Sequence, residues 1–299
     1  MSEATGPVRE FPVLGRNSAP ALTYLEAVES GNPPAEATPR TASTVLLLRE
    51  APHGGPQVFM QTRVAAMAFA AGATVFPGGG VDPRDGDAQL PMSGPELGWW
   101  SQRLGCDAEL ARELLAAACR EVYEECGVLL AGRAGPQGHT RGESAESLLG
   151  GPEPAARARE ALTNGDASLT EVLRVSGLEL RSELLTPFAR WITPAYQPRR
   201  YDTILFLARM PSGQQADGES TETETAGWVE PGEVLTDLAE GRVSMMTPTV
   251  VALERLVEAG RTGAEWLASM QRREWHMGPV QPRLVRASDG SPTLLCEVR

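Results

Sequence analysis

The segment Arg120–Val128, with the sequence REVYEECGV, carries three glutamates within five residues near the end of a predicted helix. At 100° per residue, Glu121, Glu124 and Glu125 share one face of that helix, and the adjacent face is apolar. Like charges at this spacing repel by about 0.2–0.5 kcal/mol per pair on an exposed helix. A hard divalent cation would turn the repulsion into attraction, because it binds carboxylate oxygens. The segment therefore predicts either a solvated acidic helix end or a metal site.

The helix that carries these glutamates is predicted from Ala108 to Cys126. Asp107 is suited to cap its N-terminus, and Gly127 stands where a glycine commonly ends a helix. Ala, Leu, Glu and Arg dominate the residues between these two positions, and they favour a helix.

A glycine-rich stretch, Thr74–Asp82, precedes this helix and has the sequence TVFPGGGVD. A short β-branched and aromatic strand runs into Pro77 and the three glycines 78–80. Glycine permits close approach of a ligand to the main chain. Such a stretch is either an ordinary turn or part of a binding site, and it does not decide between them alone.

Strands lie on both sides of the acidic helix, without regular β-α-β alternation. Strands are predicted at 43–49, 57–63, 200–209 and 222–229, and helices at 21–28, 155–162, 169–175, 230–240 and 247–259. The first two strands form a hairpin, and a second hairpin is predicted around 288–291. This order favours an α+β fold with a mixed β-sheet sandwiched between helices over a doubly wound parallel sheet.

The composition of the chain indicates its division into an arm, a domain and two insertions. Residues 1–40 are rich in proline and are predicted to be a flexible N-terminal arm. One domain is predicted over 41–299, with insertions at about 83–108 and 132–182. The segment 128–131 is expected to be a strand, and 183–194 an extended segment broken by prolines.

Composition excludes several classes of function. The net charge of −12 argues against nucleic-acid binding through a general basic surface. The four cysteines form no C-x-x-C pair and suit buried free thiols in a reducing cytosol, so a cytoplasmic protein is expected. No signal peptide and no apolar run long enough to span a membrane is found in the sequence.

Together, the glycine-rich stretch and the acidic helix resemble the Nudix hydrolases, whose box is G-x₅-E-x₇-R-E-U-x-E-E-x-G-U with U aliphatic. The second half of the box matches Arg120–Val128 at every specified position. The first half departs from it: Gly79 and Arg120 are 41 positions apart instead of 14, so about 27 extra residues lie inside the box. Arg112 replaces the first glutamate, and Glu113 is one residue out of register, which leaves the partner of Arg120 open.

The interrupted box resembles the Nudix subgroup of acyl-coenzyme A diphosphatases. That subgroup also carries V-F-P-G-G-x-x-D, W-x-T-P, R-R-[FY]-D-T and a late P-T helix. The corresponding segments here are Val75–Asp82, Trp191–Pro194, Arg199–Thr203 and Pro248–Thr249. The resemblance implies metal-dependent cleavage of a pyrophosphate bond, here in coenzyme A or acyl-coenzyme A, to give 3′,5′-ADP and (acyl-)4′-phosphopantetheine.

The resemblance also implies roles for the box residues. Glu121 and Glu125 would bind Mg²⁺ or Mn²⁺ directly. Glu124 would bind a further ion through water or help to deprotonate the attacking water. Arg120 would hold Glu124, and Gly79 would offer its carbonyl oxygen to a metal ion.

Residues outside the box are candidates for the base and for phosphate binding. Glu222, six residues before Trp228, is the preferred base and Glu224 the second choice, although both could belong to a solvated loop. Arg63, Arg199 and Arg200 could grip phosphates, including the 3′-phosphate of coenzyme A, or form surface ion pairs instead.

Two other functions are left open. One keeps the chemistry and changes the substrate to NADH or ADP-ribose. The other is a Nudix-fold binding module without catalysis, which would have no need of three clustered carboxylates. In each case a small nucleoside diphosphate-linked molecule is the expected partner, nucleic acid and membranes are not, and homodimerisation is left open.

Overall fold

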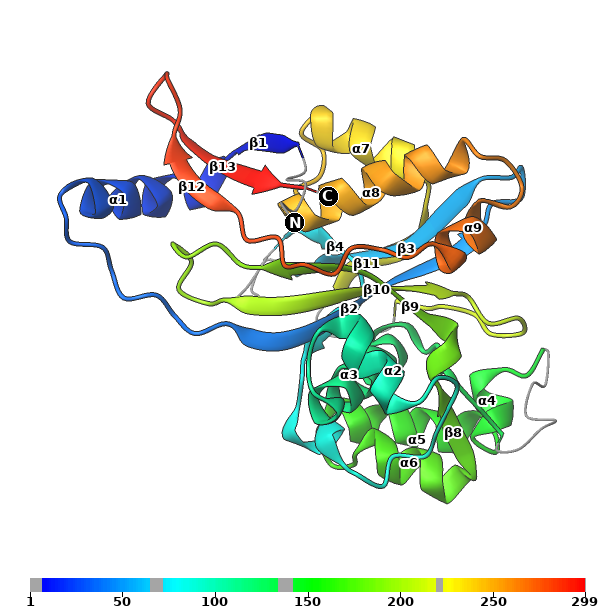
Figure 1. Ribbon diagram of the computed structural model, residues 1–299. Coiled ribbons are helices and arrows are strands. Elements are labelled where there is room, and N and C mark those ends of the chain that lie inside the picture. The colour runs from blue at the N-terminus through cyan, green and yellow to red at the C-terminus, as the bar shows by residue number, and fades with distance from the viewer. Residues whose placement is uncertain (1–6, 65–71, 134–141, 219–222, 299) are drawn as a thin grey trace.

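A mixed β-sheet forms the centre of the molecule (Figure 1). The computed structural model describes residues 7–64, 72–133, 142–218 and 223–298. In spatial order the sheet contains β11 (Thr223–Val229), β3 (Pro56–Arg63), β2 (Arg40–Glu50), β10 (Tyr201–Arg209) and β9 (Leu185–Ile192). Two short strands extend it, β4 (Thr74–Val75) beside β3 and β5 (Gly78–Gly80) beside β2. β2 and β10 are parallel, whereas the other paired strands are antiparallel.

Both faces of this sheet are buried, as the apolar run in β2 requires. Val45 and Leu47 belong to the core on one face, and Leu46 and Leu48 belong to the core on the other. Successive side chains of a strand point to opposite faces, so a continuous apolar run signals a strand covered on both sides. The predicted sandwich of a mixed sheet between helices is confirmed.

The layer of helices on one face contains the acidic helix. It is formed by α2 (Leu97–Leu104), α3 (Ala108–Cys126), α4 (Ala145–Leu148), α5 (Pro152–Thr163) and α6 (Leu169–Ser176), and α3 packs directly on β2 and β5 (Figure 1). Asp107 caps α3 by accepting a hydrogen bond from Leu110 N at 2.8 Å, and Gly127 ends it in the left-handed conformation at φ 66°. Both predicted ends of the helix are confirmed.

The opposite face is covered by α7 (Pro231–Ala239), α8 (Thr247–Gly260) and α9 (Trp266–Arg272). Pro248 lies in the first turn of α8, where its missing N–H costs no helical hydrogen bond. α7 and α8 match their predicted ranges within about a residue. α9 was not predicted, because its seven residues are too short to show a periodic pattern.

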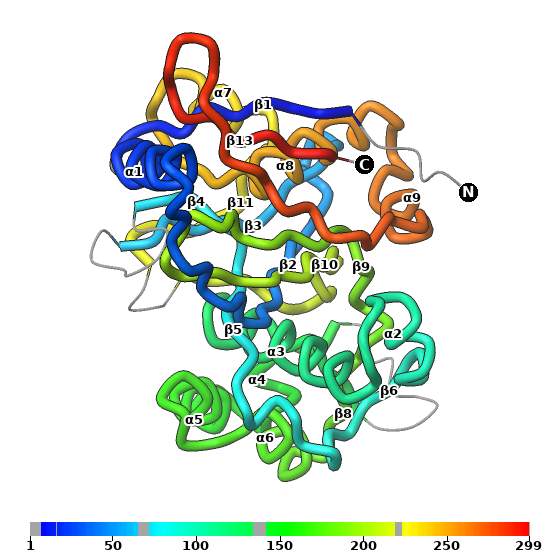
Figure 2. The backbone as a smooth tube through the Cα atoms, turned by 60° about the vertical axis from the view of Figure 1, so that its left-hand side comes forward, coloured from blue at the N-terminus to red at the C-terminus, as the bar shows by residue number. Residues whose placement is uncertain are grey.

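The N-terminal arm is more ordered than its prolines suggested. β1 (Val8–Pro12) pairs antiparallel with β13 (Pro292–Glu297), which also pairs with β12 (Arg283–Arg286). After the short 3₁₀ turn Gly15–Asn17, α1 (Ser18–Glu29) lies beside this hairpin (Figure 2). Within the predicted arm, residues 8–12 thus form a strand through backbone pairing with the distant C-terminal hairpin, which local sequence did not indicate. The helix at 21–28 and the hairpin around 288–291 are confirmed.

The two predicted insertions contain more regular structure than expected. The first holds the 3₁₀ turn η2 (Pro83–Gly86), β6 (Met92–Ser93) and α2. β6 joins β8 (Leu178–Arg181) and β7 (Ala131–Arg133) in a third small sheet, and the turn Ser182–Leu184 leads into β9. The strand expected at 128–131 begins only at its last residue. The proline-broken segment 183–194 contains a true strand, since β9 is at the end of the sheet order and an edge strand tolerates Pro187.

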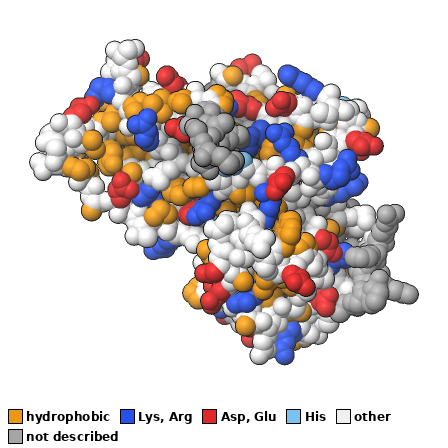
Figure 3. Space-filling model, in the orientation of Figure 1, with side chains coloured by type: hydrophobic (Ala, Val, Ile, Leu, Met, Phe, Trp, Pro, Cys, Tyr) orange, Lys and Arg blue, Asp and Glu red, His pale blue; other side chains and the backbone are white. Residues whose placement is uncertain are grey.

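The charged side chains of the surface and the four cysteines can be compared with what the composition indicated. Acidic and basic side chains are interspersed over the face shown in Figure 3. All four cysteines are free, and Cys119, Cys126 and Cys296 are buried. In the described ranges, no helix combines the length and apolar character needed to cross a membrane.

Candidate active site

The C-terminal turns of α3, the glycine strand β5 and the turn η2 meet on one side of the main sheet. β5 pairs with β2, so that Gly79 lies opposite Ser43, and α3 contacts both β5 and η2. The chain leaves β5 at Gly80 and enters η2 at Pro83. The two halves of the sequence motif are thus brought together in space, although residues 86–119 separate them in sequence.

Arg120 is the centre of this site. Its guanidinium is buried and donates to Asp85 from Nε and Nη2, both at 2.9 Å. Nη2 also reaches Gly80 O at 3.0 Å. Nη1 bonds Glu121 at 2.8 Å and Glu124 at 3.2 Å. Burial alone would lower the pKa of Arg120, but Asp85 and the glutamates hold it above its ordinary value.

Asp85 is the partner that sequence reasoning did not find. Its side chain is 1% exposed and forms a two-pronged ion pair with Arg120, the geometry that gives the strongest guanidinium–carboxylate bonds. Glu113, the residue considered for this role, faces Gly86 instead. Arg112 also belongs to this region and donates to Gly86 O at 3.1 Å, which ties η2 to the first half of α3.

The signal for Asp85 was present in the sequence. Asp85 is six residues after Gly79, which is the spacing of the acid in G-x₅-E. The residue eight positions before Arg120 is Arg112, because the intervening segment lies between the two halves of the pattern. Counting forward from the glycine gives an aspartate in the place of the glutamate, with the whole intervening segment between Asp85 and Arg120.

Glu125 is held by the sheet and the glycine loop. Its Oε2 accepts from Gln61 Nε2 at 2.6 Å and from Gly78 N at 2.9 Å. Gln61 in turn accepts from the Thr223 hydroxyl at 3.0 Å, so β3 and β11 both support this carboxylate. A Cβ atom at Gly78 would lie 2.5 Å from Ser43 O, and the residue has a φ of 154°, so this close approach requires glycine. Gln61 is a second site residue that sequence reasoning missed, because a lone glutamine in a strand gives no signal.

Glu121 lies directly against Gly79. A Cβ atom at Gly79 would be 2.4 Å from Glu121 Oε1, so only glycine leaves room for the carboxylate. The pKa of Glu121 is raised to about 8, chiefly by burial; Arg120 acts against this shift, and repulsion from Glu125 and Glu124 adds to it. Burial likewise raises the pKa of Glu124. The side chains of Glu121 and Glu124 are only 12% and 14% exposed, which accounts for the direction of both shifts.

The donor set of this site suits a hard divalent cation. Asp85, Glu121, Glu124 and Glu125 supply four carboxylates, and the first three of them pair with the guanidinium of Arg120. Oxygen donors of this kind are those that Mg²⁺ and Mn²⁺ prefer. In the part of the chain that the structure describes, no three His, Cys, Asp or Glu side chains are arranged to hold a metal ion as they stand. These carboxylates are the type of ligand that Mg²⁺ and Mn²⁺ prefer, and metal binding at this site stays a prediction.

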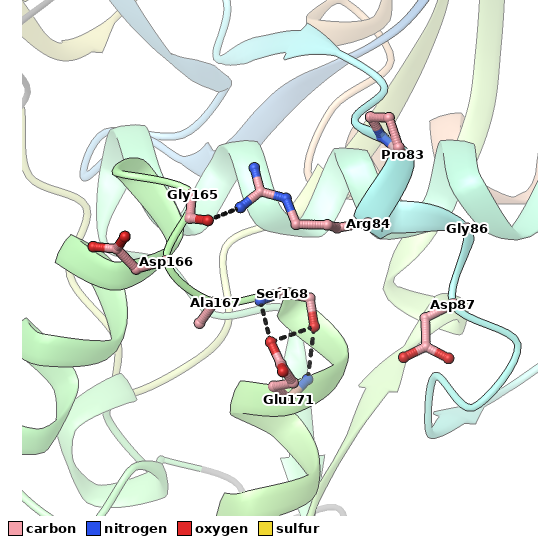
Figure 4. A pocket seen from close by; sticks show the side chains of 9 residues that line it. All are labelled: Pro83, Arg84, Gly86, Asp87, Gly165, Asp166, Ala167, Ser168 and Glu171. Carbon is pink, nitrogen blue, oxygen red and sulfur yellow. Dashed lines mark hydrogen bonds between the residues drawn. The ribbon is translucent and has the colours of Figure 1, made fainter.

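A groove of about 510 Å³ lies nearby, between η2 and the connection from α5 to α6 (Figure 4). Arg84 crosses it and bonds Gly165 O on the far wall, while also pairing with Asp82. Glu171 is occupied by Ser168, whose N and Oγ donate to its carboxylate at 2.7 and 3.0 Å. Arg84, Ser168 and Glu171 are thus engaged in hydrogen bonds within the protein, and we assign no function to this groove.

The chain is similar to known proteins in both sequence and fold. No family model matches the chain. A Caenorhabditis elegans protein assigned by name as nudix hydrolase 7 is 28% identical over 217 residues, which are 73% of this chain and 60% of that protein. The chain thus spans about 60% of the length of this curated relative. A crystal structure of a NUDIX hydrolase from Alicyclobacillus acidocaldarius is 26% identical with a TM-score of 0.63, and covers 82% of this chain and 100% of its own.

This chain has the Nudix fold. The bacterial structure decides it, because the likeness extends over the whole of that protein and most of this one. The predicted fold class is confirmed. The prediction of an enzyme agrees with both relatives, since each is named a hydrolase.

The residues predicted from the Nudix box come together as expected on α3. Glu121, Glu124 and Glu125 share one side of the helix, and Arg120 pairs with Glu124 one turn away. The structure describes one of the two candidates for the base. Glu222 lies outside the described residues, and Glu224 is exposed on β11. The Thr223 hydroxyl bonds to Gln61, which holds Glu125, so β11 begins beside the glutamates of α3.

The three arginines predicted to bind phosphate lie in different surroundings. Arg63 ends β3 two residues after Gln61, so strand alternation places its side chain on the same face of the sheet as Gln61. Arg200 is buried; it donates to Thr193 O at 3.0 Å and to Ala37 O at 2.9 Å and pairs with Glu36. Arg199 is exposed just before β10. Phosphate binding by each stays a prediction, and the surroundings favour Arg63.

Proposed function

We propose that this protein is a Nudix hydrolase that cleaves the pyrophosphate bond of a nucleoside diphosphate-linked substrate. The observation that carries the proposal is the buried Arg120 network, in which Asp85 from the first half of an interrupted box meets Glu121 and Glu124 from the second. Burying these charges is costly without a purpose, because each must be taken out of water. A purely structural helix end would not need them.

The reaction breaks one P–O bond of the diphosphate bridge. Water adds to one phosphorus, the bridging oxygen leaves on the other phosphate, and a proton is lost from the water, giving two phosphomonoesters. Bound Mg²⁺ or Mn²⁺ would supply neutralisation of the phosphate charge and a more acidic water molecule. Glu121, Glu124 and Glu125 would hold the ions, together with the carbonyl of Gly79.

The chain's own residues would keep this arrangement in place. Arg120 orients Glu121 and Glu124 and is itself fixed by Asp85. Gln61 and the amide of Gly78 hold Glu125 against the glycine loop. Such preorganisation matters for catalysis, since displacement of a group by about 1 Å can cost a hundredfold in rate. Glu222 is the proposed base, with Glu224 as the second candidate.

The proposed substrate is coenzyme A or an acyl-coenzyme A. The support is the interrupted box together with the segments W-x-T-P and R-R-Y-D-T, which lie side by side at the ends of β9 and β10. There Thr193 Oγ1 accepts from Tyr201 N at 3.0 Å, and Arg190 pairs with Asp202 at 2.6 Å. Arg63, Arg199 and Arg200 are the proposed phosphate-binding residues. Cytoplasmic location and homodimerisation remain predictions.

A substrate panel tests this proposal. Purified protein is incubated with coenzyme A, 3′-dephospho-coenzyme A, NADH and ADP-ribose in Mg²⁺ or Mn²⁺, and products are separated by chromatography. We expect release of 3′,5′-ADP and 4′-phosphopantetheine from coenzyme A, and loss of turnover in EDTA. The Glu125→Gln variant serves as the inactive control for contaminating phosphatases.

Each other outcome corrects a different part of the proposal. A preference for 3′-dephospho-coenzyme A would remove the idea of a 3′-phosphate pocket. A preference for NADH or ADP-ribose would keep the chemistry and change the substrate class. Absence of turnover on all four substrates with either metal would favour the binding module without catalysis.

A further inference from the structure

The C-terminal end of α3 is held by two segments that are distant from it in sequence. On α5, Arg159 Nε donates to Glu124 O at 2.9 Å, while Nη1 and Nη2 donate to the Asp217 carboxylate at 2.9 and 2.8 Å. Asp217 lies between β10 and β11, and its own N–H donates to Cys126 O at 3.0 Å. This ion pair, named the Arg159–Asp217 clamp below, therefore spans both segments and the last turn of α3.

The glycine of the box makes room for the clamp. Gly127 has a φ of 66°, which already favours glycine. A Cβ atom there would also lie 2.6 Å from Asp217 Oδ2 and 3.1 Å from Arg159 Nη1. The absence of a side chain at Gly127 thus serves both the helix end and the ion pair packed over it.

Two further contacts fix the same segments to α3 and the residues after it. Tyr123 donates its hydroxyl to Ala155 O on α5 at 2.8 Å, four residues before Arg159. Gln214 accepts from Leu129 N at 2.8 Å and donates to Leu129 O at 2.9 Å. The clamp is therefore part of a continuous attachment and does not depend on one surface contact. Its arginine side chain is 16% exposed.

The clamp places positive charge at a helix end where negative charges are gathered. The carbonyl end of a helix carries partial negative charge, which disfavours carboxylates in the last turn and favours cations. Glu121, Glu124 and Glu125 all lie near that end. Arg159 brings positive charge to this end of the helix by donating to the backbone carbonyl of Glu124.

We infer that Arg159 and Asp217 are positioning residues for the proposed hydrolysis, acting as one unit that fixes the last turn of α3 and the glutamates on it. The inference rests on the proposed function. It assigns a role to the second insertion, because α5 supplies the arginine. The inference also assigns a role to the connection between β10 and β11, because that connection supplies Asp217.

A double-mutant cycle tests whether the two residues act as one unit. The variants are Arg159→Met, Asp217→Asn and the double variant, with Arg159→Lys as the conservative change. Arg157→Met is the matched control, because Arg157 lies on the same helix, is 68% exposed and faces Glu153 at 3.6 Å. Thermal unfolding first establishes that each variant is folded at the assay temperature.

We expect each single variant to lower kcat at least about tenfold, with the KM for substrate within about twofold of the wild type. The double variant should lose no more than the worse single variant, since both remove the same unit. Arg159→Lys should recover part of the loss, and Arg157→Met should behave as the wild type. An unchanged kcat in folded Arg159→Met, or single effects that multiply in the double variant, would overturn the inference.

Amide hydrogen exchange separates this inference from the proposed function. Exchange of the amides of 121–130 is measured in metal-free wild type, Arg159→Met and Arg157→Met. The clamp predicts faster exchange in Arg159→Met alone. If the wild type hydrolyses none of the substrates, the proposed function fails while the exchange result still decides whether the clamp holds the turn; unchanged exchange in Arg159→Met overturns it.

Discussion

The two halves of α3 bury opposite kinds of side chain. The N-terminal half buries apolar side chains: Leu114, Leu115, Ala116 and Ala118 are at most 2% exposed and belong to the core on this face of the sheet. The C-terminal half, from Arg120 to Cys126, buries a guanidinium and a carboxylate in addition to Val122 and Cys126. One continuous helix therefore joins a packing region to a charged region.

This difference shows what each half contributes. Apolar burial stabilises the fold by about 25 cal/mol per Å² removed from water. Buried charges cost desolvation energy, and even a well-made buried ion pair is often no more stable than an apolar replacement. The N-terminal half therefore maintains the fold, whereas we attribute the charges of the C-terminal half to the proposed activity, at the expense of stability. Substitutions in the two halves should separate these contributions.

Glu125→Gln should have the largest effect. Removing one charged oxygen donor is expected to lower kcat about a thousandfold, equivalent to about 4 kcal/mol of transition-state stabilisation. The fold should survive, because the amide oxygen of glutamine can still accept from Gly78 N. Steady-state kinetics with Mg²⁺ or Mn²⁺ measures the effect. Unchanged metal-dependent hydrolysis of every diphosphate substrate would show that the metal-site assignment is wrong.

Asp85→Asn should damage both stability and activity. It leaves Arg120 buried without its charged partner, and breaking a buried ion pair costs about 3–5 kcal/mol. Denaturant unfolding measures the free energy, and kcat measures the displacement of Glu121 and Glu124. Asp85→Glu is the matched control, because it restores the residue type of the G-x₅-E pattern and keeps the charge. If Asp85→Asn unfolds like the wild type, Arg120 does not depend on Asp85.

Leu115→Ala tests the other half of the helix. The side chain is fully buried, and truncating such a leucine costs about 2–5 kcal/mol through lost contacts and the cavity left behind. We expect a lower unfolding free energy with kcat unchanged at temperatures where the variant is folded. A fall in kcat comparable to that of Glu125→Gln would remove the distinction between the two halves.

Much of this fold could be predicted from local sequence pattern. The apolar run of β2, the caps of α3 and Pro248 at the start of α8 act within a few residues, so their signals are strong. The glutamates of α3 were found for the same reason. Their grouping depends only on the spacing of residues along one helix.

What could not be predicted depends on contacts between distant segments. β1 was taken as part of a loose arm because its partner β13 lies at the other end of the chain. Gln61 gains its role only when β3 comes beside α3, and Arg159 only when α5 docks on the end of that helix. Asp85 is an intermediate case, since its spacing from Gly79 matches the G-x₅-E pattern, whereas the intervening segment places it far out of register with Arg120.

The most direct test of this account compares the unfolding midpoint of wild type and Glu121→Gln, each in EDTA and in excess Mn²⁺. Glu121 is mostly buried near Glu125 and Glu124, and Arg120 keeps its ion pairs with Asp85 and Glu124 when the charge of Glu121 is removed. We therefore predict that the variant is at least as stable as the wild type in EDTA. In Mn²⁺ the wild type should gain stability, by about 2.7 kcal/mol at a hundred times the Kd, and the variant should gain much less. A variant that is less stable in EDTA and gains as much as the wild type from Mn²⁺ would contradict the assignment of this charged half to metal-dependent function.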